Sequence, residues 1–120
     1  MQFAILCYNQ QEAIGAWTKE EDDAVMARHQ VVMEGLAARG KLGPVARLQP
    51  TTTATTVRSG RDKAVFDGPF AETKEQLLGF YIVDCASAEE AAEIAKQLVE
   101  APGCMEIRPV LSYWPAGASK

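Results

Sequence analysis

Hydrophobic residues follow one another at the start of the chain, so that a strand there would be apolar on both sides. Alternate side chains of a strand point to opposite sides. Between residues 2 and 8, Phe3, Ile5 and Cys7 would share one side, and the residues between them are also mainly apolar. This pattern is typical of a strand inside a sheet. The polar segment at residues 9–17 predicts a loop after it.

Two later segments combine a helix-start motif with apolar residues at helical spacing. Thr18 and Glu21 form a capping box, in which each side chain satisfies a free backbone amide of the other, and the segment ends at Gly40. Ser87 and Glu90 repeat the motif. The two apolar stripes consist of Val25, His29, Val32 and Leu36, and of Ala91, Ile94, Ala95 and Leu98. We therefore predict two amphipathic helices, of which the first has about twenty residues.

The other apolar runs are short and bounded by turn residues, which predicts strands. The turn residues at 59–62 would join two of them into a β-hairpin. Residues 76–78 are predicted to close one helical turn, with Gly79 as its stop. The predicted strands lie at residues 42–48, 51–58, 63–67, 80–85 and 104–111.

The resulting order of elements is two β-α-β units with a hairpin between them. Two helices can cover only one face of a four-stranded sheet, which predicts an α+β fold of the ferredoxin-like, split β-α-β type with an inserted β-hairpin. The other face carries apolar residues among charged ones such as Glu106 and Arg108. Because exposed apolar patches mark interfaces, we expect a two-fold homodimer, with small pockets between the open face and the hairpin.

Length and charge narrow the class of protein. The 120 residues suffice for one hydrophobic core, so we expect one domain over residues 1–114 and a loose tail over residues 115–120. The net charge is −4 and no basic run is present, which argues against direct binding of nucleic acid. The first eight residues lack the basic leader and the length of a signal peptide or membrane span. We therefore expect a cytoplasmic protein that does not bind membranes.

Three cysteines, Cys7, Cys85 and Cys104, are an odd number without a C-x-x-C spacing. Each lies in or beside an apolar run, so we expect reduced thiols buried in strands. A zinc site would require them to converge with His29 from four separate elements, and we predict no metal site. The sequence also lacks nucleotide-binding, hydrolase and metalloprotease motifs, and we expect no cofactor.

The strongest candidate for a functional site is Asp67-Gly68-Pro69-Phe70. Gly68 permits a positive φ, Pro69 fixes its own φ at about −65°, and Phe70 would anchor the turn as a buried side chain. The Asp67 carboxylate would then be held rigidly, as a catalytic acid or base requires. The alternative is that Asp67 only caps the turn through backbone amides.

His29 is the single histidine of the chain and the one side chain that titrates near neutrality. Its position in the apolar stripe is compatible with an ordinary core histidine whose ring nitrogens are satisfied. If it projects toward Asp67, the carboxylate would orient the ring and favour its protonated form, giving a catalytic proton-transfer pair.

Four further charged residues are candidates for binding a substrate. Arg58 and Arg108 come from different strands and could converge on a carboxylate, or each could form a salt bridge. Glu72 and Lys74 follow the Asp67 turn and would form the rim of a pocket, or only a solvated charged turn.

Several of these segments together resemble the DGPF proteins within the YCII-related family. The resemblance rests on VFDGPFAETKEQL at residues 65–77, GFY at 79–81 and EIRPV at 106–110, and it extends to LQP at 48–50 and TTVR at 55–58. It implies a dimeric α+β barrel and a small-molecule pocket, with the histidine–aspartate pair proposed for YCII relatives. One departure is Leu78, where a second glycine is common in the family.

Two functions are compatible with these features. The first is a cofactor-free enzyme that moves protons on a small polar or carboxylated molecule, with His29 and Asp67 inside a concave, partly dry pocket. The second is a non-catalytic module that binds a ligand or a protein through an open polar surface at residues 72–75. For this second function the resemblance implies an extracytoplasmic-function sigma factor as a partner.

Overall fold

The computed structural model describes residues 1–115, so all but the first residue of the tail predicted at residues 115–120 lies outside the described part. Its elements are β1 (Gln2–Asn9), α1 (Gln11–Gly15), α2 (Lys19–Ala38), β2 (Leu42–Arg47), the 3-10 turn η1 (Thr51–Thr53), β3 (Thr55–Val57), β4 (Val65–Asp67), β5 (Gln76–Asp84), α3 (Ala88–Leu98) and β6 (Cys104–Pro109). In the described part of the chain, no helix is long and apolar enough to cross a membrane.

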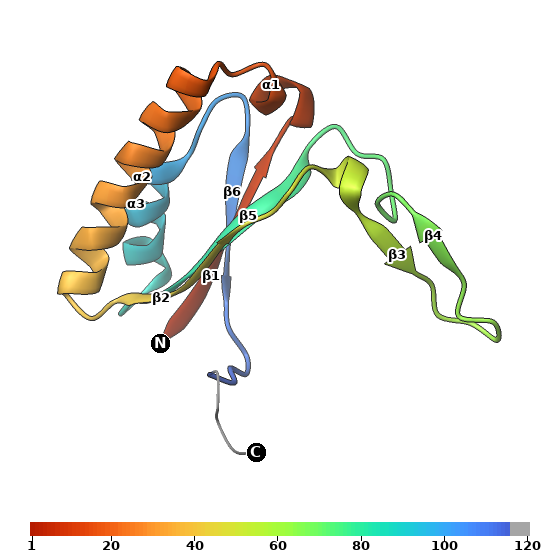
Figure 1. Cartoon of the computed structure of the whole chain (residues 1–120). Helices are drawn as coiled ribbons and strands as arrows, with labels where there is room; N and C mark the ends of the chain where they lie inside the picture. Colours follow the sequence, from red (N-terminus) through yellow and green to blue (C-terminus); the bar gives the residue numbers. More distant parts are fainter. Residues whose placement is uncertain (116–120) are drawn as a thin grey trace.

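Four strands form one antiparallel sheet in the order β2-β5-β1-β6. Helices α2 and α3 cover one face of it (Figure 1). Each of these helices connects two strands that are separated by one other strand, which is the predicted split β-α-β arrangement. The α+β fold is therefore confirmed, and β1 is an interior strand, as predicted.

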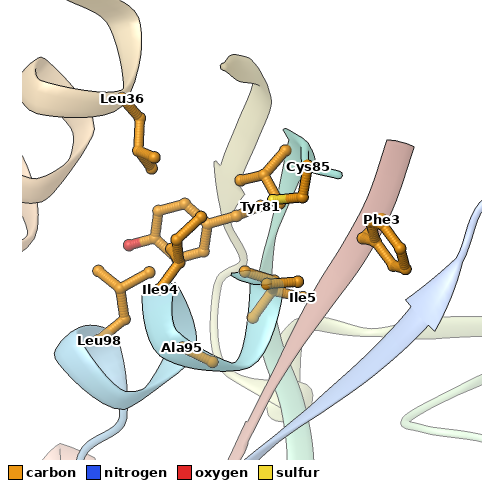
Figure 2. Packing of buried hydrophobic residues seen from close by; sticks show 10 residues of the cluster. Phe3, Ile5, Leu36, Tyr81, Cys85, Ile94, Ala95 and Leu98 are labelled. Atoms are coloured by element: carbon orange, nitrogen blue, oxygen red, sulfur yellow. The ribbon is translucent and has the colours of Figure 1, made fainter. Parts of the chain in front are cut away.

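The hydrophobic core lies between the two long helices and the face of the sheet that they cover (Figure 2). Alternate residues of the central strands β1 and β5 point to this side, because the side chains of a strand alternate in direction. The core consists of Phe3, Ile5, Leu36, Tyr81, Val83, Cys85, Ala91, Ile94, Ala95 and Leu98. Both predicted helical stripes contribute to it, which confirms their orientation.

The first predicted capping box is present at the start of α2. The Glu21 backbone N–H donates to Thr18 Oγ1 at 3.1 Å, and the Thr18 backbone N–H donates to Glu21 Oε1 at 2.9 Å. Together these bonds satisfy two backbone donors that the helix leaves free, and they fix where α2 begins.

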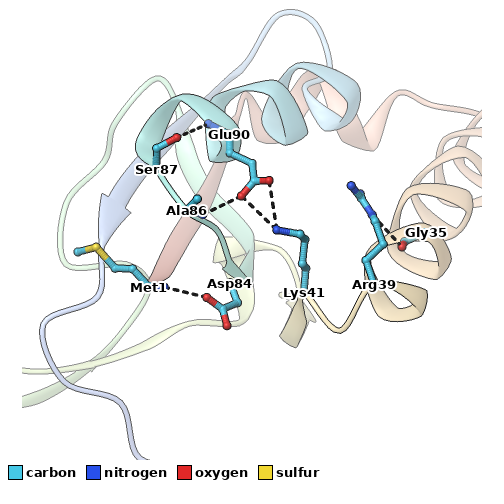
Figure 3. A network of polar contacts seen from close by, with 8 residues as sticks. All are labelled: Met1, Gly35, Arg39, Lys41, Asp84, Ala86, Ser87 and Glu90. Atoms are coloured by element: carbon cyan, nitrogen blue, oxygen red, sulfur yellow. Dashed lines mark hydrogen bonds and ion pairs between the residues drawn. The ribbon is translucent and has the colours of Figure 1, made fainter.

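The second capping box is only half formed, which corrects the prediction for α3. Ser87 Oγ accepts from the Glu90 backbone N–H at 3.2 Å, but the Glu90 carboxylate accepts from the Ala86 N–H and from Lys41 Nζ instead of from Ser87 (Figure 3). These two donors lower the pKa of Glu90. Because Lys41 directly precedes β2, the same carboxylate links α3 to the start of that strand.

The segment between β1 and α2 contains the short helix α1 where a loop was predicted. The first residue of α1, Gln11, makes two hydrogen bonds to distant segments. Its backbone N–H donates to Gln76 Oε1 at 3.3 Å, and its side-chain Oε1 accepts from the Thr51 N–H at 3.1 Å. Five residues are too few to show a helical period in the sequence. Tertiary hydrogen bonds therefore fix α1 over the end of the sheet.

The predicted helical turn at residues 76–78 is wrong, because these residues begin β5. Gly79 lies inside the strand, and a Cβ there would be 2.6 Å from the Ala46 carbonyl oxygen of β2. The glycine thus permits a close approach of two strands, rather than the end of a helix.

The inserted hairpin is present but much shorter than predicted. Strands β3 and β4 have three residues each and pair only with each other, while Thr51–Thr53 forms η1 instead of extended structure. The hairpin projects away from the helices (Figure 1). The radius of gyration of 16.1 Å accordingly exceeds the roughly 14 Å of a compact chain of this length.

Within residues 1–115, no element covers the second face of the sheet. The register places Ala4, Leu6, Phe80 and Ile82 together on this face, where all four are partly exposed. Leu6 also pairs with Glu106, and Ala4 with Arg108. This open face is thus a mixture of apolar and oppositely charged side chains, as the sequence predicted.

Candidate functional site

A cavity of about 180 Å³ lies on the helix-covered side of the sheet, between α2 and the central strands. It is lined mainly by apolar side chains, among them Ile14 of α1, Trp17, and Met26 and Met33 of α2. Neither this cavity nor a second hollow beside α1 includes a residue of the hairpin strands. Pockets between the open face and the hairpin were predicted. The cavity beside His29 lies on the opposite side of the sheet.

His29 stands in the wall of this cavity with a partner at each ring nitrogen. Its Nδ1 is 2.7 Å from the hydroxyl of Tyr81, and its Nε2 is 3.2 Å from Glu100 Oε2. The same Glu100 oxygen pairs with the guanidinium of Arg28. The rings of His29 and Tyr81 meet edge to face, with centroids 6.1 Å apart. All four groups therefore form one connected chain of polar contacts.

Three segments of the chain position these groups: α2, β5 and the loop after α3. His29 comes from the buried stripe of α2, and Tyr81 extends from β5 to the helix side of the sheet (Figure 2). Glu100 follows the end of α3, and its carbonyl oxygen accepts from the buried side chain of Asn9 at 3.0 Å. A Cβ at Gly103 would collide with the end of β1, so glycine lets this loop approach the strand. Packing therefore holds the site from several sides.

The donors and acceptors define the protonation state of the network. An ionised Glu100 carboxylate can only accept, so we assign the ring proton to Nε2 of His29, which then donates to it. Burial lowers the pKa of His29 below its ordinary value of 6.5, and the charge of Arg28 acts in the same direction, so the ring is neutral at pH 7. The unprotonated Nδ1 then accepts from the Tyr81 hydroxyl. Burial raises the pKa of Tyr81 to about 12, so that the hydroxyl retains its proton.

A second ion pair lies at the boundary of the cavity. Arg47 of β2 lines the cavity, and its two terminal nitrogens bind the two carboxylate oxygens of Asp22 in the first turn of α2. This bidentate pair lowers the pKa of Asp22. The guanidinium is therefore already occupied by a protein carboxylate.

Comparison with known proteins assigns the chain to a family. The model of the YCII-related domain matches residues 1–113. The chain is also 52% identical, over 119 residues and 96% of each chain, to an uncharacterised protein of Rhizobium meliloti (strain 1021). The chain belongs to the YCII-related domain family. The resemblance to the YCII-related family that the sequence motifs indicated is therefore confirmed.

In this YCII-related domain, Asp67 and His29 do not meet within one chain. Asp67 ends β4 on the projecting hairpin, where its side chain is exposed and has no hydrogen-bond partner among the described residues. It therefore does not cap its turn, as the alternative proposed. Phe70, expected to be a buried anchor, is 70% exposed. The turn is held by Thr56, whose hydroxyl donates to the Gly68 carbonyl oxygen at 2.7 Å.

The predicted substrate-binding residues also lie outside the cavity lining. Arg58 donates to the Phe70 carbonyl oxygen at 3.2 Å, so it supports the hairpin turn, while Glu72 and Lys74 are exposed beyond it. Arg108 is exposed on β6 and, among residues 1–115, forms no ion pair. The structure thus brings one of the predicted site residues, His29, into the cavity wall.

The cysteines differ from the prediction in their burial, although all three are free. Cys85 is buried, Cys7 is half-buried, and Cys104 is exposed and donates to Glu75 Oε2 at 3.2 Å. Burial raises the pKa of Cys7 to about 11, and the Glu75 carboxylate raises the pKa of Cys104. Neither cysteine of the cavity lining is therefore a thiolate at neutral pH. Within the described residues, no three potential metal ligands come together.

Four residues of the site were not identified from the sequence: Arg28, Arg47, Tyr81 and Glu100. Tyr81 shares a strand face with Val83 and Cys85, and a hydroxyl on such a buried face needs a partner. That signal was present in the sequence. The position of Glu100 depends on the path of the loop after α3, and that of Arg47 on the distance between β2 and α2, neither of which follows from sequence pattern.

Proposed function

We propose that this YCII-related protein is a cofactor-free enzyme that transfers protons on a small molecule bound between α2 and the sheet. The observation that carries the proposal is the position of His29 in the cavity wall, between the Tyr81 hydroxyl and the Glu100 carboxylate. A neutral imidazole at pH 7 is ready to act as a base, and the nearby carboxylate stabilises the charged ring that results. The lining thiols remain protonated, which leaves histidine as the proton acceptor.

The contacts suggest a proton relay. A substrate proton moves to the Tyr81 oxygen while the hydroxyl proton of Tyr81 moves to Nδ1 of His29. The substrate is left as an anion beside the Tyr81 hydroxyl, and the imidazolium lies between Tyr81 and Glu100. The reverse transfer to another atom of the substrate would complete an isomerisation. The arrangement resembles a base oriented by a third group, which is a common feature of enzyme sites.

Exchange of α-hydrogens of ketones into D₂O tests this proposal, because each exchange requires one proton transfer to a base. The probes are acetone, pyruvate and cyclohexanone, followed by proton NMR. We expect His29→Gln to slow the exchange of at least one ketone by about 100-fold or more. Tyr81→Phe, which keeps the aromatic ring, should slow it as well. Equal rates for the wild type and both variants with all three ketones would overturn the proposal.

A second candidate, a protein-binding module, is favoured by the apolar surface of the hairpin. Val57, Val65, Phe66 and Phe70 are exposed on an element that has only two short strands. Such a hairpin is marginally stable alone, so a partner that covers it would stabilise it. The resemblance to DGPF proteins suggests a sigma factor of the extracytoplasmic-function kind. Calorimetric titration with such a factor should show binding that Phe66→Ser abolishes and His29→Gln retains, whereas equal binding by both variants would contradict this candidate.

For the open face of the sheet we propose a second copy of the chain as the occupant, giving a dimeric α+β barrel. Glu106 and Arg108 lie two residues apart on this face, so a two-fold axis can place each opposite its complement in the other copy. The apolar residues between them would be buried at the same time. Light scattering should give the mass of two chains for the wild type and of one chain for Leu6→Glu. A single-chain mass for both would refute the dimer.

A further inference from the structure

The size of the cavity limits what it can hold. Its volume is about 180 Å³. An engineered apolar cavity of roughly 150 Å³ in another protein binds benzene. The space beside His29 therefore corresponds to one six-membered ring with a small substituent.

The lining favours an apolar ligand. The lining is mainly apolar, and it includes aromatic and thioether side chains from α2 and the segment before it, among them Trp17, Met26 and Met33. Methionine side chains adapt to the outline of a ligand, and their sulfur atoms make favourable contacts with aromatic rings. A strongly polar molecule such as a sugar would leave most of its hydroxyl groups without partners here, at a cost in binding free energy.

The charges at the cavity disfavour an anion. Arg47 and Glu100 are charged residues of the lining, and each already has a protein partner, Asp22 and Arg28 respectively. A carboxylated ligand would find no unpaired guanidinium or ammonium group among the described lining residues, and it would lie near the negative charge of Glu100. Its loss of hydration would thus remain uncompensated.

The Tyr81 hydroxyl is the polar group of the cavity wall that can bind a ligand. The Tyr81 oxygen donates to His29 Nδ1, and its lone pairs can accept one further hydrogen bond. A hydroxyl or enol group of a ligand fits this position as a donor. A carbonyl oxygen fits as an acceptor when the Tyr81 O–H turns from Nδ1 of His29 to the ligand, because a hydroxyl hydrogen can rotate.

From these observations we infer that the cavity binds a neutral molecule with a single ring and one hydroxyl or carbonyl oxygen directed at Tyr81, and not the carboxylated molecule expected from the sequence. This inference rests on the proposed function for the role of the oxygen, since that oxygen marks the site of proton transfer. The binding preference itself depends only on the shape and charge of the cavity.

The test compares two probes that share a ring and differ in charge, cyclohexanone and cyclohexanecarboxylate at neutral pH. Because the chain has a single histidine, the imidazole NMR signals report occupancy of this cavity without ambiguity. We expect cyclohexanone to shift these signals with a dissociation constant at least about tenfold below that of the carboxylate. A preference for the carboxylate, equal affinities, or no shift with either probe would overturn the inference.

Removing the charge that pairs with Arg47 should shift the preference of the cavity from the neutral ligand toward the carboxylate. In Asp22→Asn the guanidinium loses the charge of its partner, and the affinity for the carboxylate should rise about tenfold. Asp23→Asn is the matched control, because Asp23 pairs with the exposed Lys19 and lies outside the lining, so it should leave both affinities unchanged. Equal behaviour of the two variants would contradict the role assigned to the Arg47–Asp22 pair.

The same samples separate this inference from the proposed function. If cyclohexanone binds but its α-hydrogens do not exchange, the inferred ligand class stands and cyclohexanone is rejected as a substrate. If pyruvate exchanges in preference to cyclohexanone, the ligand class is rejected and proton transfer at His29 stands.

Discussion

The helix-covered side of the sheet and the projecting hairpin each carry one residue predicted to be catalytic, and they hold it in opposite ways. His29 is 7% exposed, and both of its ring nitrogens have partners from other elements. Asp67 is exposed at the end of a three-residue strand, and its carboxylate has no partner within residues 1–115. Pro69 restricts the backbone two residues after Asp67, but only packing against neighbouring elements fixes a side chain. Rigidity in this chain therefore comes from tertiary packing.

The largest expected difference between the two regions concerns stability. Leu36→Ala removes a fully buried side chain of α2 and should lower the free energy of unfolding by about 2–5 kcal/mol. Phe70→Ala removes a larger side chain from the hairpin, yet it should change this free energy by about 0.5 kcal/mol or less in the single chain. Urea unfolding measures both. A loss of several kcal/mol in Phe70→Ala would show that the hairpin packs against something absent from one chain.

Removing one hydroxyl group from the cavity and one from the hairpin should have an intermediate effect on the free energy of unfolding. Tyr81→Phe leaves Nδ1 of His29 buried without a partner, which should cost about 1–3 kcal/mol. Thr56→Val, the matched change in the hairpin, removes the bond to the Gly68 carbonyl oxygen, where water can take over. We expect a cost of about 0.5 kcal/mol there. Similar urea midpoints for the two variants would argue that the His29–Tyr81 contact contributes little.

A smaller effect should appear in the dependence of stability on pH. The pKa of His29 is lower in the folded chain than the 6.5 of the unfolded chain, so the unfolded state binds more protons between these two values. Stability should therefore decrease as the pH falls through about 6.5, and level off, for this group, below the folded pKa. His29→Gln should lack this part of the decrease. A gain in stability of the wild type relative to His29→Gln on acidification would instead mean that Glu100 raises the pKa of His29.

The sequence predicted the layers of this fold better than its site, for a physical reason. The stripes of α2 and α3 and the alternation in β1 and β5 are properties of consecutive residues, and burial of one face follows from them. Contacts of His29 with residues 52 and 71 positions away depend instead on how strands pair and how loops end. The error at residues 76–78 has the same origin, because Gly79 has one meaning at a helix end and another between paired strands.

The hairpin shows where turn chemistry alone misleads. The chain does bend after Asp67, and Gly68 takes a positive φ of 100°. The sequence indicated this local geometry correctly, but it could not indicate that the turn lies at the base of an arm that points away from the helices. A resemblance of sequence motifs carries no such distances. The cavity and its network had to be located from the packing of α2 against β5.

The smallest expected effect decides whether Asp67 takes part in the site at all. Asp67→Asn removes one exposed charge, so in a single chain it should leave both the free energy of unfolding and the pKa of His29 unchanged. NMR titration of the single histidine measures that pKa directly, and Glu72→Gln is the matched control on the same exposed segment. If Asp67→Asn alone shifts the titration of His29, the hairpin of a second copy must reach the cavity, since the two residues do not meet within one chain. The predicted histidine–aspartate pair would then form across a dimer, and the contrast between the rigid site and the free hairpin would hold only for the isolated chain.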